Sequence, residues 1–307
     1  MTQQRAIVLG GGGFIGTNLC RRLVTAGYGV RAFGRSRIVP DALAGVDWRE
    51  GDFADAAAVQ AVLEPGATVF HLIQSTPPQA MAQQAAGTPN ITPTIALLDA
   101  ARAAGVARIV FVSSGGTVYG KADKIPTPET APLAPVTPYA AANMAVEQSL
   151  ARYRDSDGLD FRVLRLTNPY GPYQIANKNQ GVIAAWIARA FRGERIEIWG
   201  DGSVIRDFIY IDDVTDALLL AAEDRSREDT FNIGSAHGRS LREVIAAVEE
   251  ALGEPLLIDW KEGRPTDVPV SVVAIGRARD VLGWTPKIDF ATGLRRTVAW
   301  WRERQGN

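Results

Sequence analysis

Two polar side chains, one helical turn apart, are the residues of this 307-residue chain best suited to acid–base chemistry. Tyr139 and Asn143 follow Thr137-Pro138, where we expect a helix to begin, because proline fits the first helical position. Residues four apart lie on one face of a helix, so the phenol and the amide would act together. A phenol titrates near 10, and a base active near pH 7 needs a pKa lowered by about three units. Asn143 can donate hydrogen bonds but carries no charge that would lower this pKa.

A glycine-rich turn is the second feature with chemical potential. Gly10, Gly13 and Gly16 give the spacing G-x-x-G-x-x-G between the apolar run 6–9 and a helical pattern over 14–26. Such a turn lets the backbone approach a pyrophosphate, and the free N–H groups of the following helix hold phosphates. We therefore predict a dinucleotide site that includes Gly10, Gly13, Phe14, Ile15 and Gly16.

The residues at the end of the second expected strand should determine whether NAD or NADP is preferred. An acidic residue there would bind the ribose 2′-hydroxyl of NAD, whereas an arginine accommodates a 2′-phosphate. Gly34-Arg35-Ser36 contains no acid and favours NADP, although a solvated basic loop would look the same. Asp52, with Phe53 beside it, is expected near the adenine edge or is a plain turn residue.

The elements that must position these residues alternate along the first half of the chain. The runs 6–9, 30–33, 68–72, 108–112 and 161–165 each read as a strand buried on both faces, with helical segments such as 14–26 and 54–63 between them. This alternation predicts an α/β fold, a Rossmann-type doubly wound parallel sheet with a smaller C-terminal substrate-binding lobe. We expect the dinucleotide-binding domain over 1–166 plus part of 207–234, and the lobe over 167–206 and 235–307. Prolines crowd residues 77–93, so a loop is expected there until a helix begins near Pro93.

Composition excludes several classes of protein. Lysine and arginine number 33 against 34 aspartate and glutamate, so the net charge of −1 gives no general attraction to nucleic acid or to anionic membranes. One cysteine, no signal-like apolar stretch and no membrane-length apolar window predict a soluble cytoplasmic protein. Two histidines and one cysteine, far apart, predict no metal site. Cys20, His71 and the late tryptophans are expected to pack in the interior, and Asp213 to cap a helix.

Many further motifs resemble one family, the extended short-chain dehydrogenase/reductases, in particular UDP-glucose 4-epimerases and their NAD-dependent epimerase/dehydratase relatives. The resemblance spans nearly the whole chain and is therefore more specific than any single motif. It is carried by the segments 10–16, 51–52, 71–72, Asn90, 113–120, 137–139, 165–172, 199–202, 206–213, 231–234, 263–268 and 282–286.

The resemblance implies that Tyr139 removes a proton from a sugar hydroxyl as hydride passes to nicotinamide. A Ser or Thr shares that hydroxyl; counted back from Tyr119 its position is Gly115, which leaves Ser114 or Thr117 as candidates. The family has lysine where this chain has Asn143, which implies a ribose-positioning amide and weak or specialised chemistry. Lys121, Lys124 or Lys178 could otherwise supply the charge from a loop. Leu72 and Asn90 are the remaining implied cofactor contacts.

On the substrate side the resemblance implies contacts to the diphosphate of a nucleotide-sugar. A plain ion pair with a neighbouring aspartate is the alternative for the arginines. A homodimer through the helix near Pro93 and the Tyr139 helix is also implied. The implied substrate residues are Asn168, Asn179, Val182, Arg206, Arg264 and Asp267.

The function that this sequence favours is that of a UDP-sugar 4-epimerase-like oxidoreductase with bound NAD or NADP. A dehydratase would need an acidic pair just before Tyr119, and Thr117-Val118 supplies none. Two alternatives stay open. Arg35 would suit an NADPH-dependent carbonyl reductase, and Asn143 would suit a catalytically weak homologue that binds cofactor or nucleotide-sugar.

Overall fold

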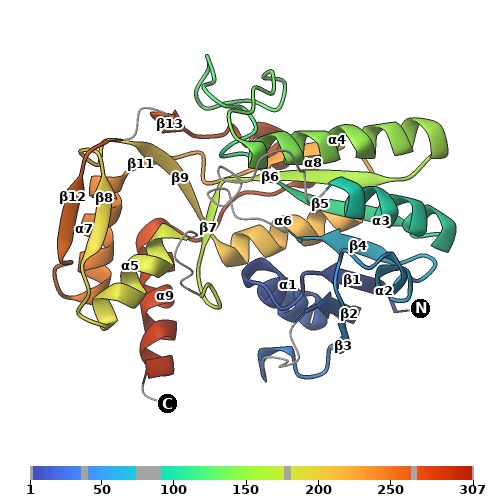
Figure 1. The fold of residues 1–307 in the computed structure, drawn as a ribbon, viewed down its shortest axis with the longest axis horizontal. Helices are drawn as coiled ribbons and strands as arrows, with labels where there is room; N and C mark the ends of the chain where they lie inside the picture. The colour runs from blue at the N-terminus through green and yellow to red at the C-terminus, as the bar shows by residue number, and fades with distance from the viewer. Residues whose placement is uncertain (1–2, 36–40, 74–90, 176–180, 264–267, 306–307) are drawn as a thin grey trace.

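A seven-stranded parallel sheet is the centre of the molecule (Figure 1). The structure is a computed structural model that describes residues 3–35, 41–73, 91–175, 181–263 and 268–305. Every pair of neighbouring strands in this sheet is parallel. The strand order is β10 (Thr230–Ile233), β6 (Phe161–Leu166), β5 (Arg108–Ser114), β4 (Thr68–His71), β1 (Arg5–Leu9), β2 (Gly29–Gly34) and β3 (Asp47–Glu50).

Helices cover both faces of this sheet, because successive residues of each strand point to opposite sides. Val8 of β1 belongs to a core cluster with Leu19 and Leu218, whereas Leu9 belongs to a second cluster with Leu97. The predicted doubly wound α/β fold is confirmed. The first cluster holds α1 (Phe14–Thr25), α6 (Ile211–Glu223) and α8 (Gly276–Leu282), and the second holds α2 (Ala56–Gln60), α3 (Ile91–Ala104) and α4 (Pro138–Asp157).

Two strands of the sheet were not expected from the sequence. β3 is the edge strand, with the polar sequence Asp-Trp-Arg-Glu, so it lacks the apolar run of a strand buried on both faces. β10 joins the opposite edge beside β6 only after the chain has passed through the lobe. β3 therefore carries a weak local signal, whereas β10 was missed because its partner β6 lies far back along the chain.

The remaining elements form a lobe on the left of the sheet in Figure 1. One small sheet has the order β11-β9-β13 with β7 paired to β9, and a second joins β12 to β8. A short 3-10 turn (Asp41–Leu43) lies outside this lobe, and no helix in the described ranges is long and apolar enough to cross a membrane. The lobe contains β7 (Asn168–Tyr170), α5 (Val182–Phe191), β8 (Ile196–Trp199), β9 (Ile205–Tyr210), β11 (Gly238–Ser240), α7 (Leu241–Leu252), β12 (Ile258–Lys261), β13 (Val270–Ser271) and α9 (Phe290–Gln305).

Asp213 does not cap a helix, contrary to the sequence prediction. The N-cap of α6 is Tyr210, which makes no side-chain cap bond, and Asp213 lies inside the first turn. Its carboxylate instead accepts the backbone N–H groups of Lys287 (2.9 Å) and Ile288 (3.1 Å). The residue therefore ties the start of α6 to the segment that leads into α9.

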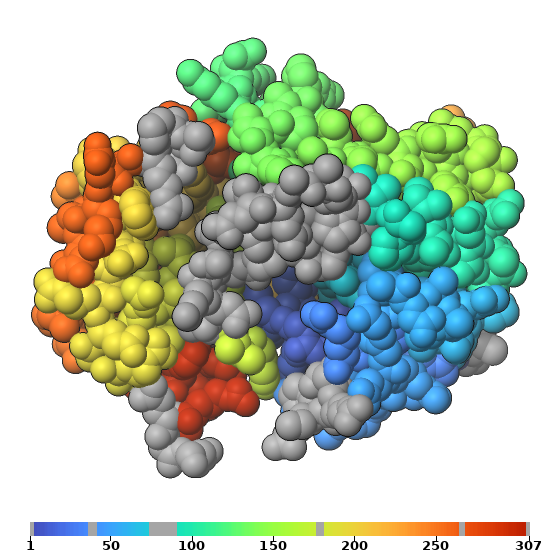
Figure 2. Space-filling model, viewed as in Figure 1, coloured from blue at the N-terminus to red at the C-terminus, as the bar shows by residue number. Residues whose placement is uncertain are grey.

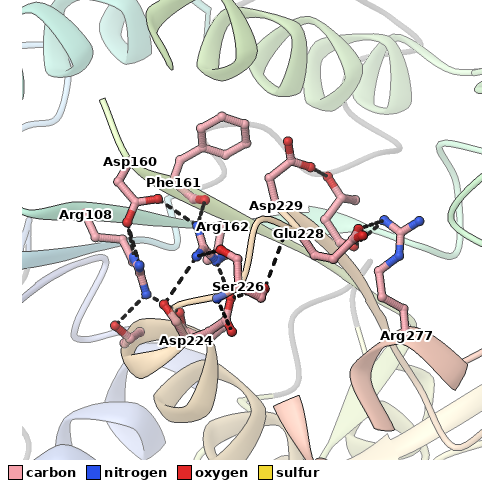
Figure 3. A network of polar contacts seen from close by, with 12 residues as sticks. Arg108, Asp160, Phe161, Arg162, Asp224, Ser226, Glu228, Asp229 and Arg277 are labelled. Carbon is pink, nitrogen blue, oxygen red and sulfur yellow. Dashed lines mark hydrogen bonds and ion pairs between the residues drawn. The ribbon is translucent and has the colours of Figure 1, made fainter. Parts of the chain in front are cut away.

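A polar network fixes the amino-terminal ends of β5 and β6 against the end of α6 (Figure 3). Arg162 pairs with Asp224 at 2.8 Å, and their side chains are only 5% and 6% exposed. Arg108 donates to Asp160 and to two carbonyls in the last turn of α6, which lack partners within the helix. Burial alone would raise the pKa of Asp224, but hydrogen bonds from Ser226 and Arg162 outweigh it and lower that pKa.

Removal of the Asp224 carboxylate should destabilise the fold, because it leaves a buried guanidinium short of its partner. We expect Asp224→Ala to lower the free energy of unfolding by about 3 kcal/mol, measured by urea denaturation. Asp280→Ala is the matched control, since Asp280 pairs with Arg279 in a pair more than half exposed and should cost under about 1 kcal/mol. Equal losses in the two variants would contradict this account.

Candidate active site

Two cavities meet at the glycine-rich turn, along the edge where the strands of the central sheet end. The larger cavity measures about 530 Å³ and the smaller about 330 Å³. Gly10, Gly13 and Leu72 line both. Figure 2 shows this face hollowed between the blue N-terminal part and the yellow and red lobe. Two cavities joined at a glycine turn suit the two halves of a dinucleotide, with its pyrophosphate between them.

The turn itself has the geometry that its glycines predict. Gly10 adopts a left-handed conformation (φ 89°), and its carbonyl accepts the N–H of Gly13 at 3.0 Å. A Cβ on Gly16 would lie 2.1 Å from the Gly10 carbonyl oxygen, so only glycine allows α1 to approach the turn. Gly13, the N-cap of α1, makes no side-chain cap bond. The N–H groups of the first turn, next to Phe14 and Ile15 on the cavity wall, are therefore left for a ligand.

Tyr139 lies on the wall of the larger cavity, in the first turn of α4. Thr137 caps this helix by accepting the N–H of Ala140 at 3.2 Å, and Pro138 occupies its first position. Ser114, at the end of β5, and Asn143 are the side chains near the Tyr139 hydroxyl that act to lower its pKa.

Both candidate hydroxyl residues, Ser114 and Thr117, line the larger cavity together with Tyr139. The Oγ1 of Thr117 is buried and has no hydrogen-bond partner in the described part of the chain. The sequence left both residues open because the turn at 115–116 could shift the register by one residue. In the structure Ser114 is the last residue of β5 and pairs with Leu166, so the turn begins directly after it.

The surroundings keep the Tyr139 phenol protonated. Burial raises the pKa of Tyr139 above its ordinary value, and the hydrogen bonds from Asn143 and Ser114 only partly oppose this shift. No lysine or arginine lines the larger cavity within the described ranges. Lys121 and Lys124 are exposed and do not line it, so they are not the substitute cations that the sequence allowed. Lys178 lies outside the described residues.

Asn143 lies beneath Tyr139 rather than on the wall of the larger cavity. It is 2% exposed, and its Nδ2 donates to the Tyr139 carbonyl at 3.0 Å. Its neighbours in this tightly packed region include His71 and Thr94. Burial lowers the pKa of His71 to about 3, and its Nε2 lies 3.1 Å from Thr94 Oγ1. The imidazole is therefore neutral, and the predicted packing role of His71 is confirmed.

A buried ion pair behind the cavity fixes α4 on the sheet. Glu147, two turns beyond Tyr139, pairs with Arg165 of β6 at 2.6 Å, and both side chains are under 9% exposed. Ser113, the neighbour of Ser114, donates to the same carboxylate at 2.5 Å. The sequence analysis did not predict the contacts among Glu147, Arg165 and Ser113. The spacing of Glu147, four residues after Asn143 and eight after Tyr139, places it on the same helix face and could have indicated them.

Two of the expected substrate residues line the larger cavity, Asn168 and Val182. Asn168 Nδ2 donates to the Asp207 carbonyl at 2.7 Å, which joins β7 to β9. Arg206 does not line this cavity; its guanidinium donates to the carbonyls of Ile205 (2.8 Å) and Val268 (2.7 Å). The sequence analysis gave an ion pair with a neighbouring aspartate as the alternative role of Arg206. The Asp207 carboxylate instead accepts hydrogen bonds from Ser235 and from the Ala236 N–H, so Asp207 is not that partner.

The expected cofactor residues are divided between the two cavities. Arg35, Asp52 and Phe53 line the smaller cavity, and Asp52 Oδ1 also accepts the N–H of Ala54 at 2.9 Å. Phe14, Ile15 and Gly16 line the larger one. Five predicted residues lie outside the described residues: Ser36, Asn90, Asn179, Arg264 and Asp267.

Comparison with known proteins agrees with this geometry. A family model described as the NAD dependent epimerase/dehydratase family matches residues 6–234. The UDP-glucose 4-epimerase of Mycolicibacterium smegmatis is 34% identical over 311 residues, covering 98% of this chain and 99% of the relative. The chain belongs to this family, as its sequence motifs implied.

Solved structures of the same type are similar over their whole length. A UDP-glucose 4-epimerase from Thermotoga maritima, solved with UDP-glucose, has a TM-score of 0.90 and 33% identity, covering 98% of this chain and 100% of that one. The UDP-glucose 4-epimerase of Thermus thermophilus, in complex with NAD, has a TM-score of 0.89 and 32% identity, covering 97% and 99%.

A lysine at position 143 should lower the pKa of Tyr139, because a cation favours the phenolate. We expect the wild-type Tyr139 signal to titrate above the ordinary value of about 10 in NMR of ¹³C-tyrosine-labelled protein, with Tyr139→Phe to assign it. Asn143→Lys should move the midpoint down, whereas Asn143→Met, similar in size but neutral, should not. An unmoved midpoint in Asn143→Lys would speak against the missing cation as the cause.

Proposed function

We propose that this chain is an NAD(P)-dependent 4-epimerase of UDP-sugars that works by transient hydride transfer at a sugar carbon. The observation that carries this proposal is that Tyr139 and Ser114 lie together on the wall of the larger cavity, which joins the glycine turn to the lobe. The Thermotoga neighbour holds UDP-glucose and the Thermus neighbour holds NAD, which supports the same pairing of ligands.

The residues present fit a dinucleotide. The left-handed Gly10 turn and the uncapped first turn of α1 form a backbone site for a pyrophosphate. When bound, the nicotinamide supplies hydride exchange, which no amino-acid side chain performs. We assign this ligand to the seven-stranded part, predicted as 1–166 plus part of 207–234, and the sugar nucleotide to the lobe.

Tyr139 would take the proton of a sugar hydroxyl and return it, while Ser114 holds the same oxygen. Asn168 and the first turn of α5 at Val182 would hold the diphosphate through neutral donors. Arg206, once turned from its carbonyl partners, is a further proposed contact, as are Asn179, Arg264 and Asp267. Because the pKa of Tyr139 is raised, little phenolate is present at pH 7 and proton removal is slow.

One observation favours a second function. Asn143 and the raised pKa of Tyr139 suit a protein that binds cofactor and nucleotide-sugar without turnover. The Arg35 side chain on the wall of the smaller cavity is the feature that would suit an NADPH-dependent reductase.

Proton NMR of UDP-glucose mixed with the purified protein, with no added dinucleotide, separates these functions. We expect UDP-galactose to form, with a turnover that increases with pH because the phenolate is the base, and no product with Tyr139→Phe. In a second sample to which NADPH is added, consumption of NADPH without epimer would indicate a reductase. Binding of UDP-glucose with neither reaction would indicate a binding protein.

We also propose a preference for NADP over NAD. No acid lies at the end of β2; Gly34 and Arg35 line the smaller cavity beside Trp48, whose buried Nε1 has no hydrogen-bond partner in the described part of the chain. Arginine is a strong partner for a 2′-phosphate.

Removal of the Arg35 guanidinium should weaken NADP binding selectively. We expect Arg35→Ala to lower NADP affinity by about 10- to 100-fold, the range of a charged hydrogen bond, and to leave NAD affinity within about twofold. Calorimetric titration of the cofactor-free protein measures both. Arg192→Ala, which removes a half-exposed surface arginine, is the control. Equal loss for NAD and NADP would refute the preference.

A further inference from the structure

The indole of Trp48 lies across two glycines, where the phosphate-binding turn meets the end of β2. Trp48 belongs to the edge strand β3 and pairs with Ala32 of β2. A Cβ on Gly12 would lie 3.1 Å from Trp48 Cη2, and a Cβ on Gly34 would lie 3.2 Å from the same atom. Carbon atoms in good contact are about 3.5–4.0 Å apart, so the indole takes the space of a side chain at both positions.

Backbone hydrogen bonds leave these glycines little freedom to move away from the indole. The Phe33 carbonyl accepts the N–H groups of Gly10 (2.8 Å) and Gly11 (3.2 Å), which ties the turn to the end of β2. The Gly34 carbonyl accepts the N–H of Gly51 at 3.0 Å, which ties β2 to the segment that follows β3. A larger residue at position 34 could therefore fit only if the indole moved.

The position that the indole fills is the one that distinguishes NAD from NADP. In a sheet of this type, an acidic residue at the end of the second strand binds the ribose 2′-hydroxyl of NAD. That position is Gly34 here, the last residue of β2, and it lines the smaller cavity together with Arg35 and Trp48. The one acid on the described part of this wall, Asp52, follows β3, and its Oδ1 accepts the N–H of Ala54 at 2.9 Å.

We propose that Trp48 is a specificity-determining residue of the dinucleotide site. Its indole occupies the place of the acid that selects NAD and forms the wall against which the adenosine ribose rests. This inference rests on the proposed function and deepens its preference for NADP. Arg35 attracts a 2′-phosphate, and Trp48 adds the physical reason why a carboxylate at position 34 has no room beside the 2′ position.

A double-variant experiment tests whether the indole excludes the acid. We expect Gly34→Asp alone to leave NAD affinity within about twofold of the wild type, because the indole blocks the carboxylate. Trp48→Phe shortens the side chain so that it no longer reaches the glycines, and keeps an aromatic residue on β3. In the double variant, NAD affinity should increase by about 10- to 100-fold, the range of a charged hydrogen bond. NADP affinity should fall there, because a carboxylate repels the 2′-phosphate.

Calorimetric titration of the cofactor-free wild type, both single variants and the double variant measures these affinities. The melting temperature without ligand is a second readout, since an overpacked site is destabilised. Gly34→Asp should melt at a lower temperature than the wild type, and Trp48→Phe should restore part of that loss, because the two residues are in contact.

Trp260→Phe is the matched control. Trp260 also packs on a glycine, because a Cβ on Gly202 would lie 3.3 Å from its Cζ3, but it belongs to β12 of the lobe and is 47% exposed. Combined with Gly34→Asp, it should neither raise NAD affinity nor restore the melting temperature.

Two results would refute the role of Trp48 while the proposed function stood. They are a gain of NAD affinity in Gly34→Asp alone that equals the gain in the double variant, and a double variant with no gain. A wild-type protein that bound neither NAD nor NADP would overturn both the inference and the proposed function.

Discussion

The buried ion pair of Glu147 and Arg165 is the constraint on which the rest of the site depends. Taking two charges out of water is costly, so such a pair persists only at short distance and with its remaining hydrogen bonds made. Glu147 belongs to α4, Arg165 to β6, and Ser113 of β5 donates to the same carboxylate. These bonds fix the rotation of α4 about its own axis and its position along the sheet. Tyr139, two turns earlier on α4, is thereby held on the cavity wall that Ser114 also lines.

The proposed site would hold anions and move protons with hydrogen bonds more than with charge. Within the described ranges the larger cavity has no lysine or arginine on its wall, which suits a chain with a net charge of −1. Backbone N–H groups at the starts of α1 and α5 provide local positive potential in their place. Because no cation is near, nothing offsets the effect of burial, and the pKa of Tyr139 stays raised. Arg35, on the smaller cavity, is the exception, and it would serve the far end of the dinucleotide.

Features coded within a few neighbouring residues could be predicted from the sequence. The strands β1, β2, β4, β5 and β6, the Gly10–Gly16 turn and the start of α4 at Pro138 all lie as expected. β3 and β10 were missed because one is a polar edge strand and the other returns from the lobe to pair with β6. The expected cap at Asp213 was wrong because its partners, Lys287 and Ile288, lie far along the chain.

By itself, the sequence determined the family, the doubly wound sheet, the phosphate-binding turn and the place of Tyr139 one turn before an uncharged Asn143. These features can be predicted because each depends on the spacing of residues within a short segment of the chain. Only the tertiary structure brought Ser114 and Thr117 to the cavity wall that carries Tyr139. It also packed Asn143 beside His71 and Thr94 and put Thr167 and Gln174 on the cavity wall. Each of these outcomes depends on packing between segments distant in the chain, and burial and hydrogen bonding across such contacts cannot be read from either segment alone.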